Sequence, residues 1–161
     1  MKKGFTLIEL IVVIAIIAVM GAVIAPNAFK SIEKAKIAAT VQDLNSIKTA
    51  AGAYFTDMSA WPTSAANFTT GSGAWDGPYL DKWPEGNRWP GSVYTWNNVI
   101  GTSFGPGANI AERSISVSNL GTAVAGKLEA QIDPGNSNST GVAHSTASTI
   151  DFLVSRDGPV N

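Results

Sequence analysis

The chain opens with one long apolar run. From Phe5 to Ala25 it reads FTLIELIVVIAIIAVMGAVIA, in which Glu9 is the one charged residue. As a helix, these 21 residues would span roughly 30 Å, about the thickness of a bilayer's hydrocarbon core. Lys2 and Lys3 precede the run, as the positive-inside rule expects at a cytoplasmic end. The pattern predicts a single-pass membrane anchor with its N-terminus inside. A removable secretory signal is disfavoured, because no A-x-A cleavage site follows the run.

Beyond Pro26 the pattern becomes amphipathic. Apolar residues recur at spacings of three and four, while charged residues occupy other faces. The apolar positions are Ile37, Val41, Leu44, Ile47, Ala51, Tyr54 and Met58. This spacing predicts a near-continuous helix from about Phe5 to about Asp57, on the order of 80 Å long. Pro26 is expected to kink or locally unwind it, because proline removes one backbone hydrogen bond and crowds the preceding turn.

The remainder of the chain is predicted to form short strands and loops. Three segments contain β-branched or aromatic residues in partial alternation, bounded by Gly, Pro or Asn: 92–100, 113–120 and 148–155. Residues 124–132 predict a short helix that ends before Pro134. An antiparallel sheet laid on the apolar stripe would bury Tyr54 and Phe55. The predicted fold class is α+β, with a long N-terminal helix packed on a small antiparallel sheet.

Composition supports the same division and excludes several functions. After residue 60 come 13 of the 16 glycines, 7 of the 8 prolines and all five tryptophans. The net charge is −1, with no basic run after the N-terminus, which disfavours nucleic acid as a partner. Cysteine is absent, which excludes disulfides and thiol chemistry. The single histidine, His144, has no triad signature around it, so no catalytic residue is assigned and an enzyme is disfavoured.

The N-terminal sequence KGFTLIELIVVIAIIAVMGAVIAP resembles the signal and first helix of type IV pilins and of type II secretion pseudopilins. The likeness rests on a basic leader ending in Gly4, an aromatic Phe5, the T-L-I-E-L run containing Glu9, an unbroken apolar helix and Pro26. It implies cleavage between Gly4 and Phe5 by a prepilin peptidase, and methylation of the new N-terminus at Phe5. The implied division is a leader at 1–4, a transmembrane and assembly helix at 5–28, and a pilin-like globular head at 29–161.

Glu9 requires an explanation, because a lone carboxylate in a membrane helix is costly unless it is paired. The resemblance implies that Glu9 meets the freed amine of Phe5 on a neighbouring subunit, which neutralises both charges and sets the axial register. The alternative is a hydrated carboxylate near the headgroups. Small residues permit close helix packing: Ala15, Ala18, Gly21, Ala22 and Ala25. Gly21 and Pro26 also mark where the helix is expected to stretch during assembly, unless Pro26 is a static kink.

The tryptophans lie in a segment rich in Pro and Gly between the long helix and the first strand. Residues 54–62 and 77–96 resemble the loop that follows the long helix in major pseudopilins and several pilins. We expect the indoles to pack this loop onto the helix and sheet. The alternative is an aromatic surface that binds sugars or serves adhesion.

Calcium is the one cofactor that the resemblance suggests. Pseudopilins of this type often bind it near the C-terminus, and a similar pattern here is Asp151, Ser155, Asp157 and Gly158, although Arg156 interrupts it. Calcium needs six to eight oxygen ligands. Further oxygens could come from Asp133, Asn136 and Asn138. A solvated turn explains these residues equally, so no metal ligand and no cofactor is assigned.

Together these features predict a structural subunit of a type IV pilus-type filament, assembled by bundling of the N-terminal helices after cleavage. Expected partners are further copies of the chain, a prepilin peptidase, inner-membrane assembly machinery and, before assembly, the membrane. The subunit is expected first in the inner membrane and then in an extracellular pilus. A pseudopilin in a periplasmic pseudopilus is the second hypothesis, favoured by the absent cysteines, and a membrane-anchored binding module is the third. Polar loops at 101–107 and 135–148 favour the surface filament.

Overall fold

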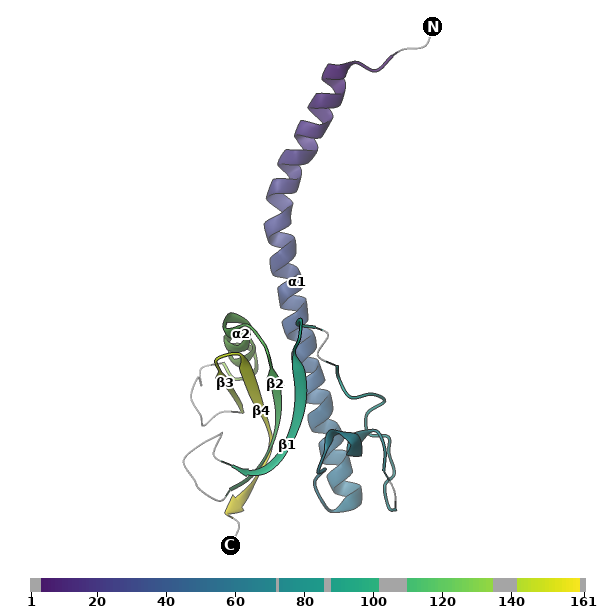
Figure 1. The fold of residues 1–161 in the computed structure, drawn as a ribbon, viewed down its shortest axis with the longest axis vertical. Helices are drawn as coiled ribbons and strands as arrows, with labels where there is room; N and C mark the ends of the chain where they lie inside the picture. Colours follow the sequence, from purple (N-terminus) through teal and green to yellow (C-terminus); the bar gives the residue numbers. More distant parts are fainter. Residues whose placement is uncertain (1–3, 72, 86–87, 102–109, 135–141, 160–161) are drawn as a thin grey trace. The chain divides into compact units, whose positions relative to one another are not determined.

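The computed structural model describes residues 4–71, 73–85, 88–101, 110–134 and 142–159, and within these ranges the side chains of all but 99–101, 110–111 and 156–159. The chain divides into two compact units, residues 1–36 and 37–161. The elements in chain order (Figure 1) are α1 (Leu7–Met58), the 3-10 helix η1 (Ala65–Phe68), β1 (Val93–Gly101), β2 (Ile110–Ser118), α2 (Thr122–Ile132), β3 (Ala143–Thr146) and β4 (Thr149–Pro159). The predicted α+β class is confirmed. A head that begins at residue 29 stays a prediction.

The first unit contains the apolar part of α1. Its large apolar side chains are exposed from Phe5 to Ile32, and the segment is long and apolar enough to cross a membrane. The helix runs without interruption through Pro26, so of the two predicted effects of this proline the local unwinding is wrong, and the kink stays a prediction. Loss of one backbone hydrogen bond is a smaller cost than ending one helix and nucleating another.

The second unit is built around the amphipathic part of α1. The predicted stripe is confirmed, because Ile37, Leu44, Ile47, Ala51 and Tyr54 are buried, while Val41 and Met58 lie half-buried at its margins. The stripe shares one core with the inner face of the sheet and with the buried residues of α2, Ala125 and Leu128. Apolar burial on this scale is the main stabilising contribution to the head.

Phe55 does not join this core, contrary to prediction. Its side chain is 41% exposed and stacks on Trp61, with ring centroids 4.6 Å apart. A step of one residue turns a helix by about 100°, so the neighbour of the buried Tyr54 points away from the stripe.

The sheet is antiparallel, with strand order β1-β2-β4-β3 (Figure 1). One row of cross-strand partners passes through all four strands and is buried throughout: Trp96, Ile115, Phe152 and Ala143. The adjacent row, which points to the other face, is polar: Thr95, Ser116, Asp151 and His144. This alternation is that of a sheet with one face in the core.

Three strands and α2 lie where the sequence predicts them, with ends shifted by a few residues. Strand β3 was missed, because residues 135–148 were assigned to a loop. The four residues Ala143–Thr146 pair with β4 along its free edge, and Ala143 completes the buried row. The rest of the predicted polar loops, at 102–107 and 135–141, lies outside the described residues.

Leu44→Ala should lower the free energy of unfolding of the head by about 2–4 kcal/mol, because this fully buried side chain would leave a cavity. Urea denaturation of residues 29–161, followed by tryptophan fluorescence, measures the loss. The exposed neighbour provides the control, and Asn45→Ala should change the same quantity by less than about 0.5 kcal/mol. Equal small effects of both substitutions would contradict the packing of the stripe.

Candidate assembly site

The first turn of α1 is closed by a capping box. The Thr6 backbone N–H donates to Glu9 Oε2 at 2.8 Å, and the Thr6 hydroxyl donates to the same oxygen at 2.7 Å. In return, the Glu9 backbone N–H donates to Thr6 Oγ1 at 3.3 Å. The exchange satisfies two of the backbone N–H groups that have no partner at a helix start. Glu9 therefore has a structural partner on its own chain.

The sequence contains a signature of this capping box that our sequence-based prediction missed. A Ser or Thr followed three residues later by Glu is its signature, and T-L-I-E fits it. Both side-chain bonds go to Oε2, and within the described residues Oε1 accepts none. One carboxylate oxygen is thus open to a second donor. The carboxylate also lies at the positive end of the helix dipole.

The predicted processing residues lie just before this turn. Gly4 and Phe5 precede the first helical residue, and the Phe5 side chain is 81% exposed. Gly4 and Phe5 lie five and four residues before Glu9 in the sequence, in the segment that leads into the helix. Pro26 is 17 residues beyond Glu9, or about 25 Å along the helix, and belongs to no common site with it.

The apolar surface beyond Glu9 is not smooth. Ala15 lies in a hollow whose other lining residues are Val12, Ile16, Val19 and Met20. A small side chain between larger ones lets a neighbouring helix place a side chain close to the backbone. The predicted close packing of helices stays a prediction.

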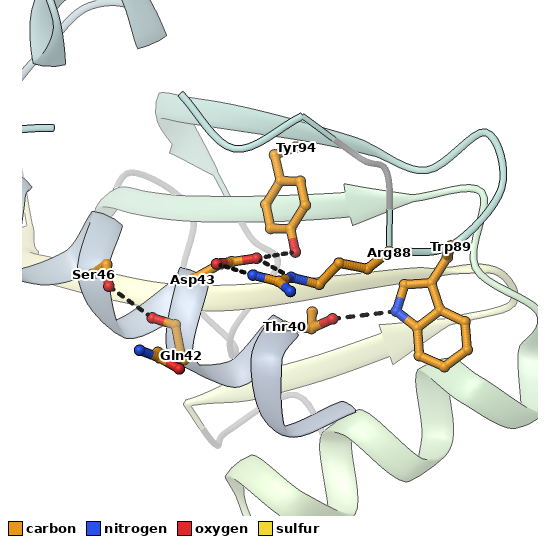
Figure 2. A network of polar contacts seen from close by, with 7 residues as sticks. All are labelled: Thr40, Gln42, Asp43, Ser46, Arg88, Trp89 and Tyr94. Atoms are coloured by element: carbon orange, nitrogen blue, oxygen red, sulfur yellow. Dashed lines mark hydrogen bonds and ion pairs between the residues drawn. The ribbon is translucent and has the colours of Figure 1, made fainter. Parts of the chain in front are cut away.

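A separate polar cluster in the head fixes the loop at residues 59–92, which we call the aromatic loop, to α1 (Figure 2). The Arg88 guanidinium binds Asp43 through two bonds, Nε to Oδ2 at 2.5 Å and Nη2 to Oδ1 at 2.7 Å. The Tyr94 hydroxyl donates to Asp43 Oδ2 at 3.2 Å, and Trp89 Nε1 donates to Thr40 Oγ1 at 3.2 Å. Thr40 and Asp43 are three residues apart on α1, so one helix turn holds the end of the loop and the start of β1.

The electrostatics of this cluster favour its bonded state. The hydrogen bond to Asp43 raises the pKa of Arg88 above its ordinary value. Burial, together with the charge of Asp43, raises the pKa of Tyr94 to about 12. At neutral pH the cluster therefore contains a charged guanidinium and a neutral phenol, both donating to one carboxylate.

The tryptophans hold the same loop in place by hydrogen bonds as well as by burial. Four indole N–H groups donate: Trp75 to Asn67 O, Trp83 to Tyr94 O, Trp89 to Thr40 Oγ1 and Trp96 to Pro62 O. Trp61 lies between Phe55 and Arg113, whose guanidinium is 5.4 Å from its ring centroid. All five indoles are buried or half-buried. This supports the packing interpretation over an exposed aromatic surface.

Trp75 explains two of the loop's glycines. A Cβ atom at Gly71 or at Gly77 would come within 2.4 Å of the Trp75 ring. Any larger residue at either position would displace the indole that donates to Asn67. The glycines are therefore required by the close approach of an aromatic ring.

The structure describes part of the residue set considered for calcium. Asp151 and Asp157 both lie in the extended strand β4, which at about 3.3 Å per residue places them roughly 20 Å apart. Asp151 accepts a hydrogen bond from Ser116, and Asp133 accepts one from the Val142 backbone N–H. Asn136 and Asn138 lie outside the described residues. Among the described residues, no three His, Cys, Asp or Glu side chains are grouped to hold a metal.

Comparison with known proteins adds independent findings. Residues 1–25 match the sequence family described as the prokaryotic N-terminal methylation motif, and residues 31–102 match the family described as PilW, C-terminal. Type II secretion system core protein G of Klebsiella pneumoniae is 38% identical over 63 residues, which is 39% of this chain and 45% of that protein. No solved structure matches the chain.

Proteins of the same name give similar values. The one from Pectobacterium carotovorum subsp. carotovorum is 35% identical and the one from Escherichia coli (strain K12) is 36% identical, each over 63 residues, 39% of this chain, and over 40% and 43% of their own lengths. The chain thus spans less than half the length of these relatives. The predicted resemblance to the type IV pilin and pseudopilin family is confirmed.

Tyr94→Phe should reduce the fall in the free energy of unfolding that the head shows at high pH. Because the pKa of Tyr94 rises from 10 in the unfolded chain to about 12 in the folded one, its contribution is complete below pH 10 and is lost as the pH rises through 12. The total is about 2–3 kcal/mol. Urea titrations of residues 29–161 between pH 9 and 12 should show a smaller decline for Tyr94→Phe than for the unmodified head. If the free energy of unfolding fell equally with pH in both proteins, the folded structure would not raise the pKa of Tyr94.

Proposed function

We propose that this chain is the structural subunit of a type IV pilus-type filament. It carries the N-terminal methylation motif, which is found in pilins and pseudopilins. The observation that carries the proposal is the combination at its N-terminus. An exposed apolar helix begins in a Thr6–Glu9 capping box, directly after the implied cleavage point at Gly4 and Phe5.

The exposed helix defines what the subunit needs as partners. Apolar side chains from Phe5 to Ile32 require either lipid tails or other helices around them. A bilayer supplies the first environment, in keeping with a segment long enough to span one. A bundle of identical helices supplies the second. Identical subunits that add head to tail form an open fibre, because such contacts do not close on themselves.

Glu9 directs the change from one environment to the other. In the single chain, Thr6 occupies one oxygen of its carboxylate. Cleavage before Phe5 creates an amine, and in the proposed filament a neighbour's Phe5 amine binds the open Oε1. Pairing the two charges avoids the cost of a single charge buried among apolar helices. Each added subunit would then bring one amine and one carboxylate.

A pseudopilus of a type II secretion system is the second candidate. The relatives that match this chain are named type II secretion system core protein G, which favours it. Both candidates use the same subunit chemistry and differ in where the filament ends, outside the cell or in the periplasm. The family is a structural one, and a monomeric binding module has less support because the aromatic loop is packed onto its own head.

Mass spectrometry of the N-terminus tests the proposal in the native host. A chain that begins at methylated Phe5 in material sheared from the cell surface would support an extracellular pilus. The same processed chain confined to the membrane fraction would favour the pseudopilus. An uncut Met1 in both fractions would contradict either filament, because the amine that pairs with Glu9 would not exist.

Glu9→Gln and Glu9→Leu separate the two roles of Glu9. Glutamine can still accept the Thr6 N–H bond but carries no charge, whereas leucine can do neither. We expect both variants to be cleaved, and both to yield roughly tenfold less sheared filament or lower, because the Phe5 amine would be buried without a counter-charge. Immunoblots of sheared and membrane fractions measure this. Normal filament from Glu9→Gln alone would show that capping, and not charge pairing, is what assembly requires.

A further inference from the structure

We propose that Lys30 and Lys34 bind the phosphate group of an anionic phospholipid on the side of the membrane that carries the head. This inference rests on the proposed membrane-anchored state and adds a lipid site to it. Both lysines belong to α1 and both are exposed. They are four residues apart, so their side chains leave the same side of the helix.

The helix backbone at Lys30 lies at the outer edge of the headgroup layer, and the backbone at Lys34 lies beyond it. If Phe5 to Ala25 fills the hydrocarbon core, Lys30 lies about 7 Å beyond it along the helix and Lys34 about 13 Å. The headgroup region of one leaflet is roughly 5–7 Å thick. Helix side chains also lean toward the N-terminal end, which here is the membrane side. Lys30 is thus level with the phosphates, and the flexible stem of Lys34 reaches back toward them.

The two lysine side chains are available to bind an anion. Within the described part of the chain, neither lysine forms an ion pair. The nearby Glu33 and Lys36 each take part in an interaction of their own within the chain. Two like charges at a spacing of four repel each other, and one phosphate between them would remove that repulsion. Phe29 beside them is 71% exposed and can enter the boundary of the acyl chains.

A carboxylate on a second copy of the chain is the competing partner for these lysines. Depth decides for the lipid, because the stored subunit presents both lysines to headgroups before any second copy is bound. Leader removal strengthens the point, since it deletes Lys2 and Lys3 and leaves Lys30 and Lys34 as exposed positive side chains of the first unit. Assembly would then have to release this lipid.

The test uses the full chain in vesicles and a fluorophore placed below the proposed site. The native sequence has no cysteine, so Val23→Cys provides one labelling position. Position 23 is exposed and lies 7 and 11 residues before the lysines, on the same helix face. Vesicles contain phosphatidylcholine and phosphatidylglycerol, and either lipid is brominated on its acyl chains. Quenching by each brominated lipid then gives the relative affinity of phosphatidylglycerol next to the label.

We expect phosphatidylglycerol to be preferred by roughly fivefold per lysine at low ionic strength, and the preference to weaken with added salt. The double substitution Lys30→Gln and Lys34→Gln should abolish it. Lys48→Gln, which removes an exposed charge on the head, should leave it unchanged.

Three other outcomes would overturn the inference, each for a distinguishable reason. If the chain does not float with vesicles at all, the proposed membrane anchoring fails and the lipid site fails with it. If it inserts but shows equal quenching by both lipids, only the lipid site fails. Loss of filaments on the double substitution, without any lipid preference in the native chain, would assign the lysines to a carboxylate of a second copy.

Discussion

The structure depends on one helix that must satisfy two different surroundings along its length. From residue 37 onward, α1 packs against other parts of the same chain. The apolar stripe on one side of the helix is buried in the core that it shares with the sheet. From Leu7 to Ala25 the helix is apolar on every side apart from Glu9, and none of its large side chains is buried within the chain. The first pattern makes a folded head, since a stripe can be covered by one sheet. The second pattern is not covered by the described part of the chain, and in the proposed function lipid or other copies of α1 cover it.

A second constraint on the head is the segment between α1 and β1, where 34 residues with little regular structure must be held in place. Hydrogen-bonded ladders are scarce there, so side chains replace them. Asp43 collects donors from Arg88 and Tyr94, and indole N–H groups reach backbone carbonyls on the loop and on β1. Because a buried indole ring is held by packing and its N–H by a hydrogen bond, each of the four donating tryptophans fixes both the position and the orientation of its segment. The aromatic loop is thereby part of the head and not a free surface.

The parts of this fold that could be predicted are those that repeat along the sequence. A stripe at spacings of three and four identifies the buried side of α1, and an apolar run identifies its exposed half. The parts that were missed depend on partners far away or on a single residue step. Arg88 and Asp43 are 45 residues apart, with no local signal that joins them. Strand β3 is short and polar and exists because β4 offers an edge. Phe55 was misplaced because an apolar side chain next to Tyr54 faces a different side.

At the N-terminal turn of α1, the first role of Glu9 is local, because it caps the start of its own helix. A carboxylate at the third position of a helix stabilises that helix start whatever else surrounds it. In the single chain this contact keeps Glu9 bound to Thr6 and leaves one oxygen open. A charge held in place beforehand loses little freedom when a cation arrives, so the capping contact pre-organises the carboxylate for a second bond. In the proposed function, Glu9 would therefore begin the helix in the single chain and pair with an amine in the filament.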